Sequence, residues 1–237
     1  MKSPTGEWIA TPMNFCLSSD HIDVWQSSAL FPPETLASFC EVLSDDEHRK
    51  ANRLRDPVKR IESQGSRGLL RCLLGYALQT DPKTFVFSIG SHGKPYIADK
   101  WQGMSIGFNL SHSQGRVLIA MSLDREVGVD VEWISPDLDW APLARQYFSA
   151  REEVSLANLP KDEQRRGFYR GWVRKEAMLK ATGEGLSSAL QADIDTHSPI
   201  VDLPVDDDYV AAVVGTPSLA SVRLWSPPPG TPGGGLG

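Results

Sequence analysis

Glu126-Val-Gly-Val-Asp-Val-Glu-Trp133 has valine at every second position, with Asp130 and Glu132 between and after the last two. A β-strand points successive side chains to opposite faces, so the three valines share one face while Asp130 and Glu132 share the other. The segment therefore predicts a strand that buries one face and presents two neighbouring carboxylates on the second.

Residues 168–182 are predicted to form a helix that carries a third carboxylate. Residues four apart on a helix lie one above another, which places Trp172, Glu176 and Lys180 on one face. Glu176 therefore lies one turn from an ammonium group. Aromatic residues at this spacing are typical of a core, so Phe168 and Trp172 are expected to pack beneath the site.

Three carboxylates beside a lysine suit a hard cation such as Mg²⁺, which takes oxygen ligands and completes its shell with water and substrate phosphates. Burying Asp130, Glu132 and Glu176 together without a cation is costly, because like charges at short range favour protonation. Taken singly, the strand acids are equally typical of a solvated edge strand, and Glu176 with Lys180 of an exposed ion pair. Only the combination favours a metal site.

Four sequence blocks, in order along the chain, carry a wider pattern. They are Gly93-Lys94-Pro95, Phe108-Asn-Leu-Ser-His-Ser113, Gly128-Val-Asp-Val-Glu132 and the helical run from Phe168 through Lys175-Glu176 and Lys180 to Leu186. Together they resemble the 4'-phosphopantetheinyl transferases of the larger, monomeric type, which activate peptide and polyketide synthases. Residues 53–57 and 66–71 look similar to the N-terminal half of that family, so the resemblance covers most of the chain.

The resemblance implies an α+β fold of two similar α/β subdomains related by a pseudo-twofold axis, each a small antiparallel sheet packed with a long helix. The expected halves are residues 1–124, on the side of the coenzyme A adenine and 3'-phosphate, and residues 125–225, with the metal-binding carboxylates and the catalytic helix. Coenzyme A is expected in the cleft between them. Residues 226–237 contain Pro-Pro-Pro and Gly-Gly-Gly, a composition typical of a disordered tail.

The resemblance also implies Mg²⁺- or Mn²⁺-dependent transfer of 4'-phosphopantetheine from coenzyme A to a serine of an apo carrier protein, with release of 3',5'-ADP. The carrier is expected to be an acyl, peptidyl or aryl carrier domain of fatty-acid, polyketide or nonribosomal peptide synthesis. Asp130, Glu132 and Glu176 are expected to hold the metal, with Lys180 on a phosphate oxygen. A serine hydroxyl needs a base, which stays open between Glu176, Glu152 and a metal-bound water.

Coenzyme A carries a diphosphate and a 3'-phosphate, so its site needs a dication and several cations spread along its length. The resemblance places Lys94 and the Ser111-His112 pair at the phosphates, with Arg53 and Arg67 near the 3'-phosphate and adenine. A catalytic Ser-His pair is disfavoured, because neighbours in an extended segment face opposite ways. The alternative role for His112 is a hydrogen bond that stabilises a turn.

Other activities are compatible with the same residues. A Mg²⁺-dependent phosphodiester hydrolase would let water attack, and a coenzyme-A-binding protein would keep the site without catalysis. An interaction module that uses the basic residues between 49 and 71 is a third alternative. Eight cations fall in this segment, although such runs are equally typical of a solvated helix face.

The 237-residue chain is 41% hydrophobic and has a formal net charge of −6. This charge argues against a nucleic-acid surface, which usually carries clustered excess lysine and arginine. The N-terminus lacks an apolar signal core, and the longest apolar run, residues 117–121, is too short to span a bilayer. Cys16, Cys40 and Cys72 lack metal-binding spacing and are expected as reduced thiols. The chain is expected to be a cytoplasmic monomer without membrane or nucleic-acid partners.

Local signals predict the remaining elements. Helices are expected over residues 34–43, 45–54, 63–79, 142–148, 150–159 and 164–182, and strands over 22–25, 85–89, 106–110, 116–123, 126–133, 193–195, 210–214 and 222–225. Ser44 and Ser149 are expected N-caps, each with a glutamate three residues later that completes a capping box. The strands at 116–123 and 126–133 are expected to pair as an antiparallel hairpin about residues 124–125.

Overall fold

The computed structural model describes residues 6–99, 103–183, 200–216, 221–228 and 231. Within these ranges the fold is α+β, as predicted. The strands are β1 (Ile9–Ala10), β2 (His21–Ser28), β3 (Phe87–Ile89), β4 (Pro95–Ile97), β5 (Ile106–Ser113), β6 (Arg116–Leu123), β7 (Glu126–Trp133), β8 (Ile200–Asp202), β9 (Tyr209–Thr216) and β10 (Ser221–Ser226). The α-helices are α1 (Pro33–Glu41), α2 (Asp45–Asn52), α3 (Pro57–Leu78), α4 (Trp140–Tyr147), α5 (Ala150–Ala157) and α6 (Lys161–Thr182). The strand expected at 193–195 and most of the tail expected to be disordered lie outside the described residues.

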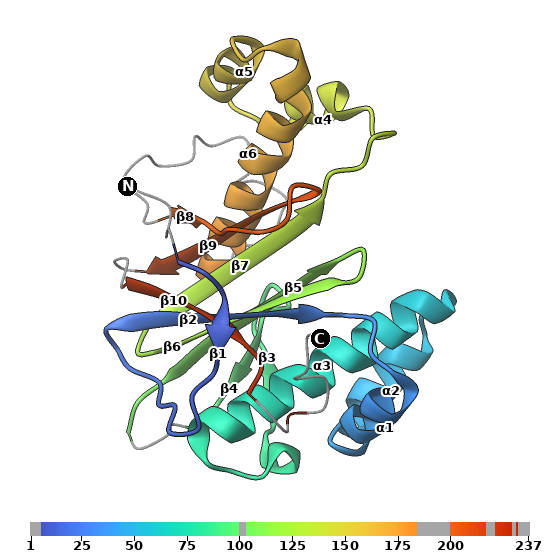
Figure 1. Cartoon of the computed structure of the whole chain (residues 1–237), viewed down its shortest axis with the longest axis vertical. Helices are drawn as coiled ribbons and strands as arrows, with labels where there is room; N and C mark the ends of the chain where they lie inside the picture. The colour runs from blue at the N-terminus through green and yellow to red at the C-terminus, as the bar shows by residue number, and fades with distance from the viewer. Residues whose placement is uncertain (1–5, 100–102, 184–199, 217–220, 229–230, 232–237) are drawn as a thin grey trace.

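The first sheet has the strand order β1-β10-β2-β6-β5 (Figure 1). β2, β6 and β5 are antiparallel, whereas β10 lies parallel to β1 and β2. The sheet is therefore mixed, and it joins β10, from the end of the described chain, to strands from its beginning. Buried Asp23 of β2 fixes β10 by accepting hydrogen bonds from Arg223 at 2.7 and 2.9 Å and from Trp225 at 2.7 Å. Asp23 and Arg223 are 200 positions apart, so no local pattern signals this pairing.

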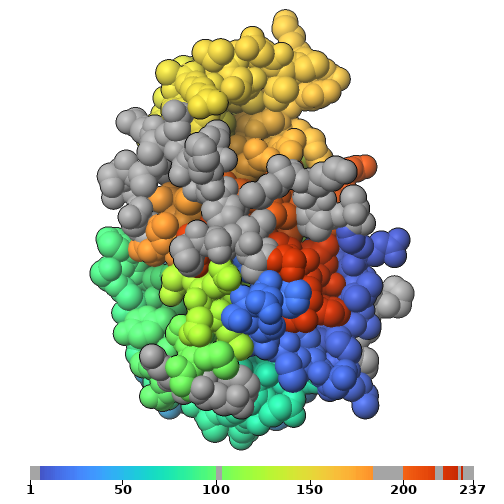
Figure 2. All heavy atoms as spheres, turned by 90° about the vertical axis from the view of Figure 1, so that its left-hand side faces the viewer, coloured from blue at the N-terminus to red at the C-terminus, as the bar shows by residue number. Residues whose placement is uncertain are grey.

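The second sheet is antiparallel with the order β7-β9-β8, and α6 packs across β7 and β9. Gly128 permits this approach, because a Cβ there would lie 2.0 Å from the carbonyl oxygen of Ala177 and 2.5 Å from the amide nitrogen of Ala181. The helix ends at Gly183, whose left-handed φ of 72° favours glycine. α4 and α5 lie at the far end of α6 and form the upper lobe of the molecule in Figures 1 and 2.

Three apolar cores connect these layers. One lies between α3 and the first sheet and contains Trp25, Phe39 and Phe108. In the second, the valines of β7 pack with Ile22 and Leu118 of the first sheet, which confirms the predicted buried face and brings the two sheets into contact. The third lies among α4, α5, α6 and β9. The first sheet is thus covered by α3 and the second by α6, each a helix of 22 residues, while the pseudo-twofold axis and the boundary at residues 124 and 125 stay predictions.

The expected hairpin between β6 and β7 is wrong. β6 pairs with β5 through the turn at Gln114-Gly115 and with β2 along its other edge, so neither edge is open to β7. The chain turns away at Asp124, whose φ is 52°. It then passes against Gly107, where a Cβ would lie 1.9 Å from the carbonyl oxygen of Arg125. β7 pairs with β9 instead.

The helix starts follow the predicted caps. Ser44 and Ser149 each accept a hydrogen bond from the amide three residues later, and the glutamate at that position bonds back to the serine amide. α3 begins at Pro57, earlier than expected, because Asp56 caps the helix and proline suits its first turn. None of the helices in the described ranges is both long and apolar enough to cross a membrane.

Candidate active site

A hydrogen-bonded cluster joins β5, β7 and α6. Asp130 of β7 is 3% exposed, and its Oδ1 accepts hydrogen bonds from Lys180 Nζ of α6 at 2.6 Å and from Ser111 Oγ of β5 at 2.7 Å. Lys180 Nζ also donates to Ser111 Oγ at 3.1 Å. Residues predicted from three separate sequence blocks therefore meet at one point, because β7 turns its acidic face toward α6.

Glu132 and Glu176 lie within electrostatic reach of this cluster. Burial raises the pKa of Glu132 to about 7, the charges of Asp130 and Glu176 add to the rise, and a hydrogen bond donated by Ser113 Oγ at 2.9 Å opposes it. Burial and then the Asp130 charge raise the pKa of Glu176, against the pull of Lys180. Burial likewise raises the pKa of Asp130, again opposed by Lys180. The three carboxylates are therefore neighbours that resist being charged together.

Lys180, Ser111 and Ser113 do not supply all the positive charge and hydrogen-bond donors that three neighbouring carboxylates need. Oδ2 of Asp130 is buried, and no hydrogen-bond partner for it is found in the described part of the chain. Among the residues that the structure describes, no group of three or more His, Cys, Asp or Glu side chains is already arranged to hold a metal ion. A hard dication would supply the missing charge and a partner for Oδ2, and carboxylate oxygens are the ligands that Mg²⁺ and Mn²⁺ prefer. The donor set fits such an ion.

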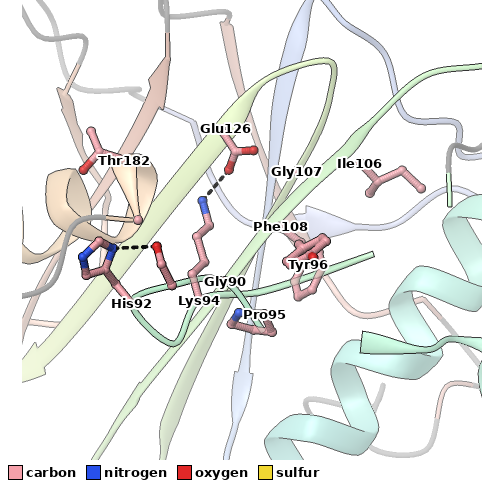
Figure 3. A pocket seen from close by; sticks show the side chains of 12 residues that line it. Gly90, His92, Lys94, Pro95, Tyr96, Ile106, Gly107, Phe108, Glu126 and Thr182 are labelled. Atoms are coloured by element: carbon pink, nitrogen blue, oxygen red, sulfur yellow. Dashed lines mark hydrogen bonds and ion pairs between the residues drawn. The ribbon is translucent and has the colours of Figure 1, made fainter. Parts of the chain in front are cut away.

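A cavity of about 310 Å³ is lined by other residues of the same three elements and by a neighbouring hairpin (Figure 3). Its walls come from the β3–β4 hairpin, the first half of β5, the start of β7 and the end of α6; they comprise Gly90, Ser91, His92, Lys94, Pro95, Tyr96, Ile106, Gly107, Phe108, Glu126, Thr182 and Gly183. Thr182 and Gly183 lie two and three residues beyond Lys180, at the C-terminal end of α6. The cavity therefore lies where β5, β7 and α6 meet the β3–β4 hairpin.

Lys94 lies in the wall of this cavity, where it ties three elements together (Figure 3). Its Nζ donates to Glu126 Oε2 at 2.5 Å, to the carbonyl of Ala181 at 3.0 Å and to that of Val127 at 3.3 Å. An ammonium has three protons to donate, so a phosphate at Lys94 has to exchange with one of these acceptors. The Glu126 side chain is 62% exposed. Exposed ion pairs contribute little free energy, so losing the contact with Glu126 costs the least of the three.

His112 follows Ser111 on the opposite, exposed side of β5, as the alternation of a strand predicts. The surrounding protein lowers the pKa of His112 by withdrawing the ring from water; Glu62 opposes this shift and Lys180 adds to it. His112 is therefore close to the cluster without sharing a proton with Ser111.

The two predicted arginines belong to helices of the first half. Arg67 of α3 pairs with Glu47 at 3.5 Å and lies 5.5 Å from the centroid of the Phe87 ring. Arg53 is exposed at the C-terminal end of α2. Neither contacts the carboxylate cluster through an interaction seen in the described residues.

Glu152 lies on α5, where its carboxylate makes structural contacts. It accepts a hydrogen bond from the Ser149 amide at 2.8 Å and pairs with Lys175 Nζ of α6 at 2.8 Å. Lys175 is 3% exposed and lies 5.8 Å from the Phe148 ring centroid. Lys175 thus joins α6 to α5, whereas its neighbour Glu176 lies within electrostatic reach of Asp130.

Comparison with known proteins agrees with this geometry. The sequence profile of the 4'-phosphopantetheinyl transferase superfamily matches residues 126–215. The chain is 34% identical over 218 residues to the 4'-phosphopantetheinyl transferase HetI of a Nostoc species, which covers 87% of this chain and 92% of that protein. The chain belongs to the 4'-phosphopantetheinyl transferase superfamily. It is also 35% identical over 162 residues to the transferase Sfp of Bacillus subtilis, covering 61% of this chain and 69% of Sfp. Over 130 residues it is 35% identical to the transferase AcpT of Escherichia coli, covering 55% and 64% respectively.

Sequence reasoning missed two polar residues of this transferase-family site, Asn109 and Ser113. Both lie on β5 and accept hydrogen bonds from amides of β7. Their signal in the sequence was the spacing of Asn109, Ser111 and Ser113, which puts three polar side chains on one face of a strand that is otherwise buried.

Proposed function

We propose that this chain transfers the 4'-phosphopantetheine group of coenzyme A to a serine hydroxyl of an apo carrier protein. The observation that carries the proposal is the contact of Lys180 with Asp130 and Ser111 in a member of this superfamily. The relatives HetI, Sfp and AcpT are all named as 4'-phosphopantetheinyl transferases, which supports the same activity here.

Asp130, Glu132 and Glu176 would hold Mg²⁺ or Mn²⁺. The unpartnered Oδ2 of Asp130 and the raised pKa of all three carboxylates support this assignment, because both are relieved by a cation. When bound, the dication would neutralise charge on the diphosphate of coenzyme A and on the departing 3',5'-ADP.

In the proposed reaction, the serine Oγ of the carrier forms a bond to the β-phosphorus of coenzyme A. The bond from that phosphorus to 3',5'-ADP breaks, and the ADP leaves with the electron pair. Lys180 would contact a phosphate oxygen while Asp130 and Ser111 hold its ammonium in place. Glu176 would accept the serine proton, because the contacts of Glu152 commit that carboxylate to α5 and Lys175.

The remaining coenzyme A contacts follow the cavity and the first half of the chain. Lys94 would give up its hydrogen bond to Glu126 and bind a phosphate in its place. His112 would bind a second phosphate from the exposed side of β5. Arg67 and Arg53 would serve the 3'-phosphate and adenine. These cations spread positive charge along the cofactor, as its separated phosphates require.

The proposed protein partner is an acyl, peptidyl or aryl carrier domain of fatty-acid, polyketide or nonribosomal peptide synthesis. We further propose that the chain acts as a cytoplasmic monomer without a nucleic-acid or membrane partner. The formal charge of −6 supports the first exclusion.

Intact-protein mass measurement tests the function. With Mg²⁺, coenzyme A and an apo carrier, the carrier is expected to gain the mass of one phosphopantetheine group, and Asp130→Asn and Glu176→Gln are expected to abolish the gain. Glu34→Gln, a change at an exposed position of α1, serves as the matched control and should retain activity. Free phosphopantetheine without carrier modification would indicate a hydrolase, and full activity of Asp130→Asn would remove the basis of the proposal.

A further inference from the structure

The open edge of β7 faces β5. β9 occupies one edge of β7 in the second sheet, and β5 is itself the edge strand of the first sheet. Within the described residues no backbone ladder joins β5 to β7. An edge strand carries amide groups that need partners once they are buried, so the amides on this side of β7 must be satisfied in another way.

Side chains of β5 satisfy these amides. Every second residue of β5 accepts one hydrogen bond from β7: Asn109 Oδ1 from the Val129 amide at 3.0 Å, Ser111 Oγ from the Val131 amide at 3.4 Å, and Ser113 Oγ from the Trp133 amide at 3.1 Å. The members of each pair are 20 positions apart in the sequence. The two strands are thus joined by a ladder of side chains.

This ladder fixes the direction of each serine proton. An amide N–H can only donate, so the hydroxyl accepts from it and keeps one proton to donate elsewhere. That proton is directed to the carboxylate preceding the amide: Ser111 Oγ lies 2.7 Å from Asp130 Oδ1, and Ser113 Oγ lies 2.9 Å from Glu132 Oε2. Each serine therefore orients one carboxylate of the site.

The two carboxylates depend on their serines to different degrees. Asp130 takes hydrogen bonds from both Ser111 and Lys180 and is almost fully buried, so its position is held from two sides. Glu132 has a longer side chain, is only half-buried, and takes its hydrogen bond from Ser113. Loss of the serine hydroxyl would free the Glu132 carboxylate to turn between several rotamers.

We infer that Ser113 is a positioning residue for Glu132, which it holds by a donated hydrogen bond in the orientation that binds the divalent cation. The inference rests on the proposed function for the presence of that cation. Groups that orient a metal ligand typically change metal affinity by about 10–100-fold when they are removed. Because one neutral hydrogen bond is involved here, we expect a loss near the lower end, roughly ten-fold.

Two readouts on the full-length protein test the inference. Mn²⁺ binding in the presence of coenzyme A, without a carrier, is measured by electron paramagnetic resonance, and the Mg²⁺ concentration at half-maximal transfer is measured by mass spectrometry. Ser113→Ala is expected to weaken both roughly ten-fold, and Ser113→Thr, which keeps the hydroxyl, is expected to restore both. The matched control is Ser122→Ala: Ser122 is a buried serine of β6 that donates to the His21 carbonyl at 3.2 Å.

Coupling to Glu132 distinguishes positioning from general destabilisation. In a Glu132→Gln background, Ser113→Ala should add no further loss of Mn²⁺ affinity, because the carboxylate it orients is gone. If Ser113→Ala does not fold, Ser113→Cys, a weak donor of similar size, should give an intermediate loss. Wild-type Mn²⁺ affinity in Ser113→Ala, or in Ser113→Cys if the alanine variant does not fold, overturns the inference, as does an equal loss in Ser122→Ala. A wild-type protein that binds Mn²⁺ but modifies no carrier overturns the proposed function alone.

Discussion

Replacing Glu132 by glutamine is expected to stabilise the metal-free protein near neutral pH. Burial and neighbouring charges raise the pKa of Glu132 to about 7 in the folded protein, from an ordinary value of 4.5. Between these two pH values the folded protein binds a proton that the unfolded chain has lost. The contribution of Glu132 to stability is therefore largest below about pH 4.5 and is lost as the pH rises toward 7. Glutamine imitates the protonated side chain at every pH.

The size of the effect follows from these two values. Their difference of about 2.5, at about 1.4 kcal/mol for each pKa unit, sets an upper limit of about 3.5 kcal/mol on the disadvantage of wild type. Glu132 is partly exposed, and Asp130 and Glu176 titrate together with it. The measured difference for this one substitution is therefore expected to be about 1–2 kcal/mol.

Urea unfolding in the presence of EDTA, repeated from about pH 5 to about pH 8, measures the prediction. The unfolding free energies of wild type and Glu132→Gln are expected to differ least at the acidic end, and the advantage of the variant is expected to grow until the pH passes about 7. Mg²⁺ with coenzyme A should reverse this order, because ligands that bind the folded wild type stabilise it by mass action. Glu34→Gln, at an exposed position, should show neither effect.

Two results would refute the reasoning. A difference between wild type and Glu132→Gln that stays constant across this pH range would show that Glu132 does not titrate as the structure indicates. Equal stabilisation of both proteins by Mg²⁺ with coenzyme A would show that Glu132 does not contribute to cation binding.

The other predictions concern single contacts of α6. Lys175→Met is expected to lower the unfolding free energy by about 3 kcal/mol in urea titrations, because it leaves Glu152 without the cation of a largely buried ion pair. Gly128→Ala is expected to cost about 3 kcal/mol and lower the calorimetric Tm by about 10 °C, since the new Cβ would meet the carbonyl of Ala177 at 2.0 Å. Lys180→Arg keeps the charge but not the compact ammonium geometry, so carrier modification should slow by at least about ten-fold while thermal stability changes little. An unchanged transfer rate for Lys180→Arg would contradict a phosphate contact at that position.

The core of the site could be predicted because its signals are local. The alternation of β7 fixes the face of Asp130 and Glu132, and the helical spacing places Glu176 one turn from Lys180. Both elements appear in the structure, and the contact of Lys180 with Asp130 joins them. Helix capping was predictable for the same reason, since the bonds of Ser44 and Ser149 span three residues.

The pairing of strands that are far apart in the chain could not be predicted from the sequence. The nearly continuous apolar run of β6 could pair with β7, which follows it, or with β2, which lies far upstream; in the structure it pairs with β2 and β5. The position of β10 depends on Asp23 and Arg223, two residues that carry no mutual signal in the chain. Composition and periodicity report which face of a strand is buried, but they do not report which strand lies beside it.

The join between the two sheets has different chemistry on the two sides of β7. On one side its valines pack into an apolar core with Ile22 and Leu118. Such a core stabilises the fold and tolerates substitutions that keep the volume and shape of the side chains. On its open edge, the amides of β7 are met by Ser111 and Ser113, and the same hydroxyls hold the acidic side chains of the site. A backbone ladder at this edge would satisfy the amides but would not supply the serine hydroxyls that donate to the carboxylates. The side-chain ladder therefore connects the halves and orients the site with one set of atoms, so substitutions there are expected to change cation binding before they change the fold.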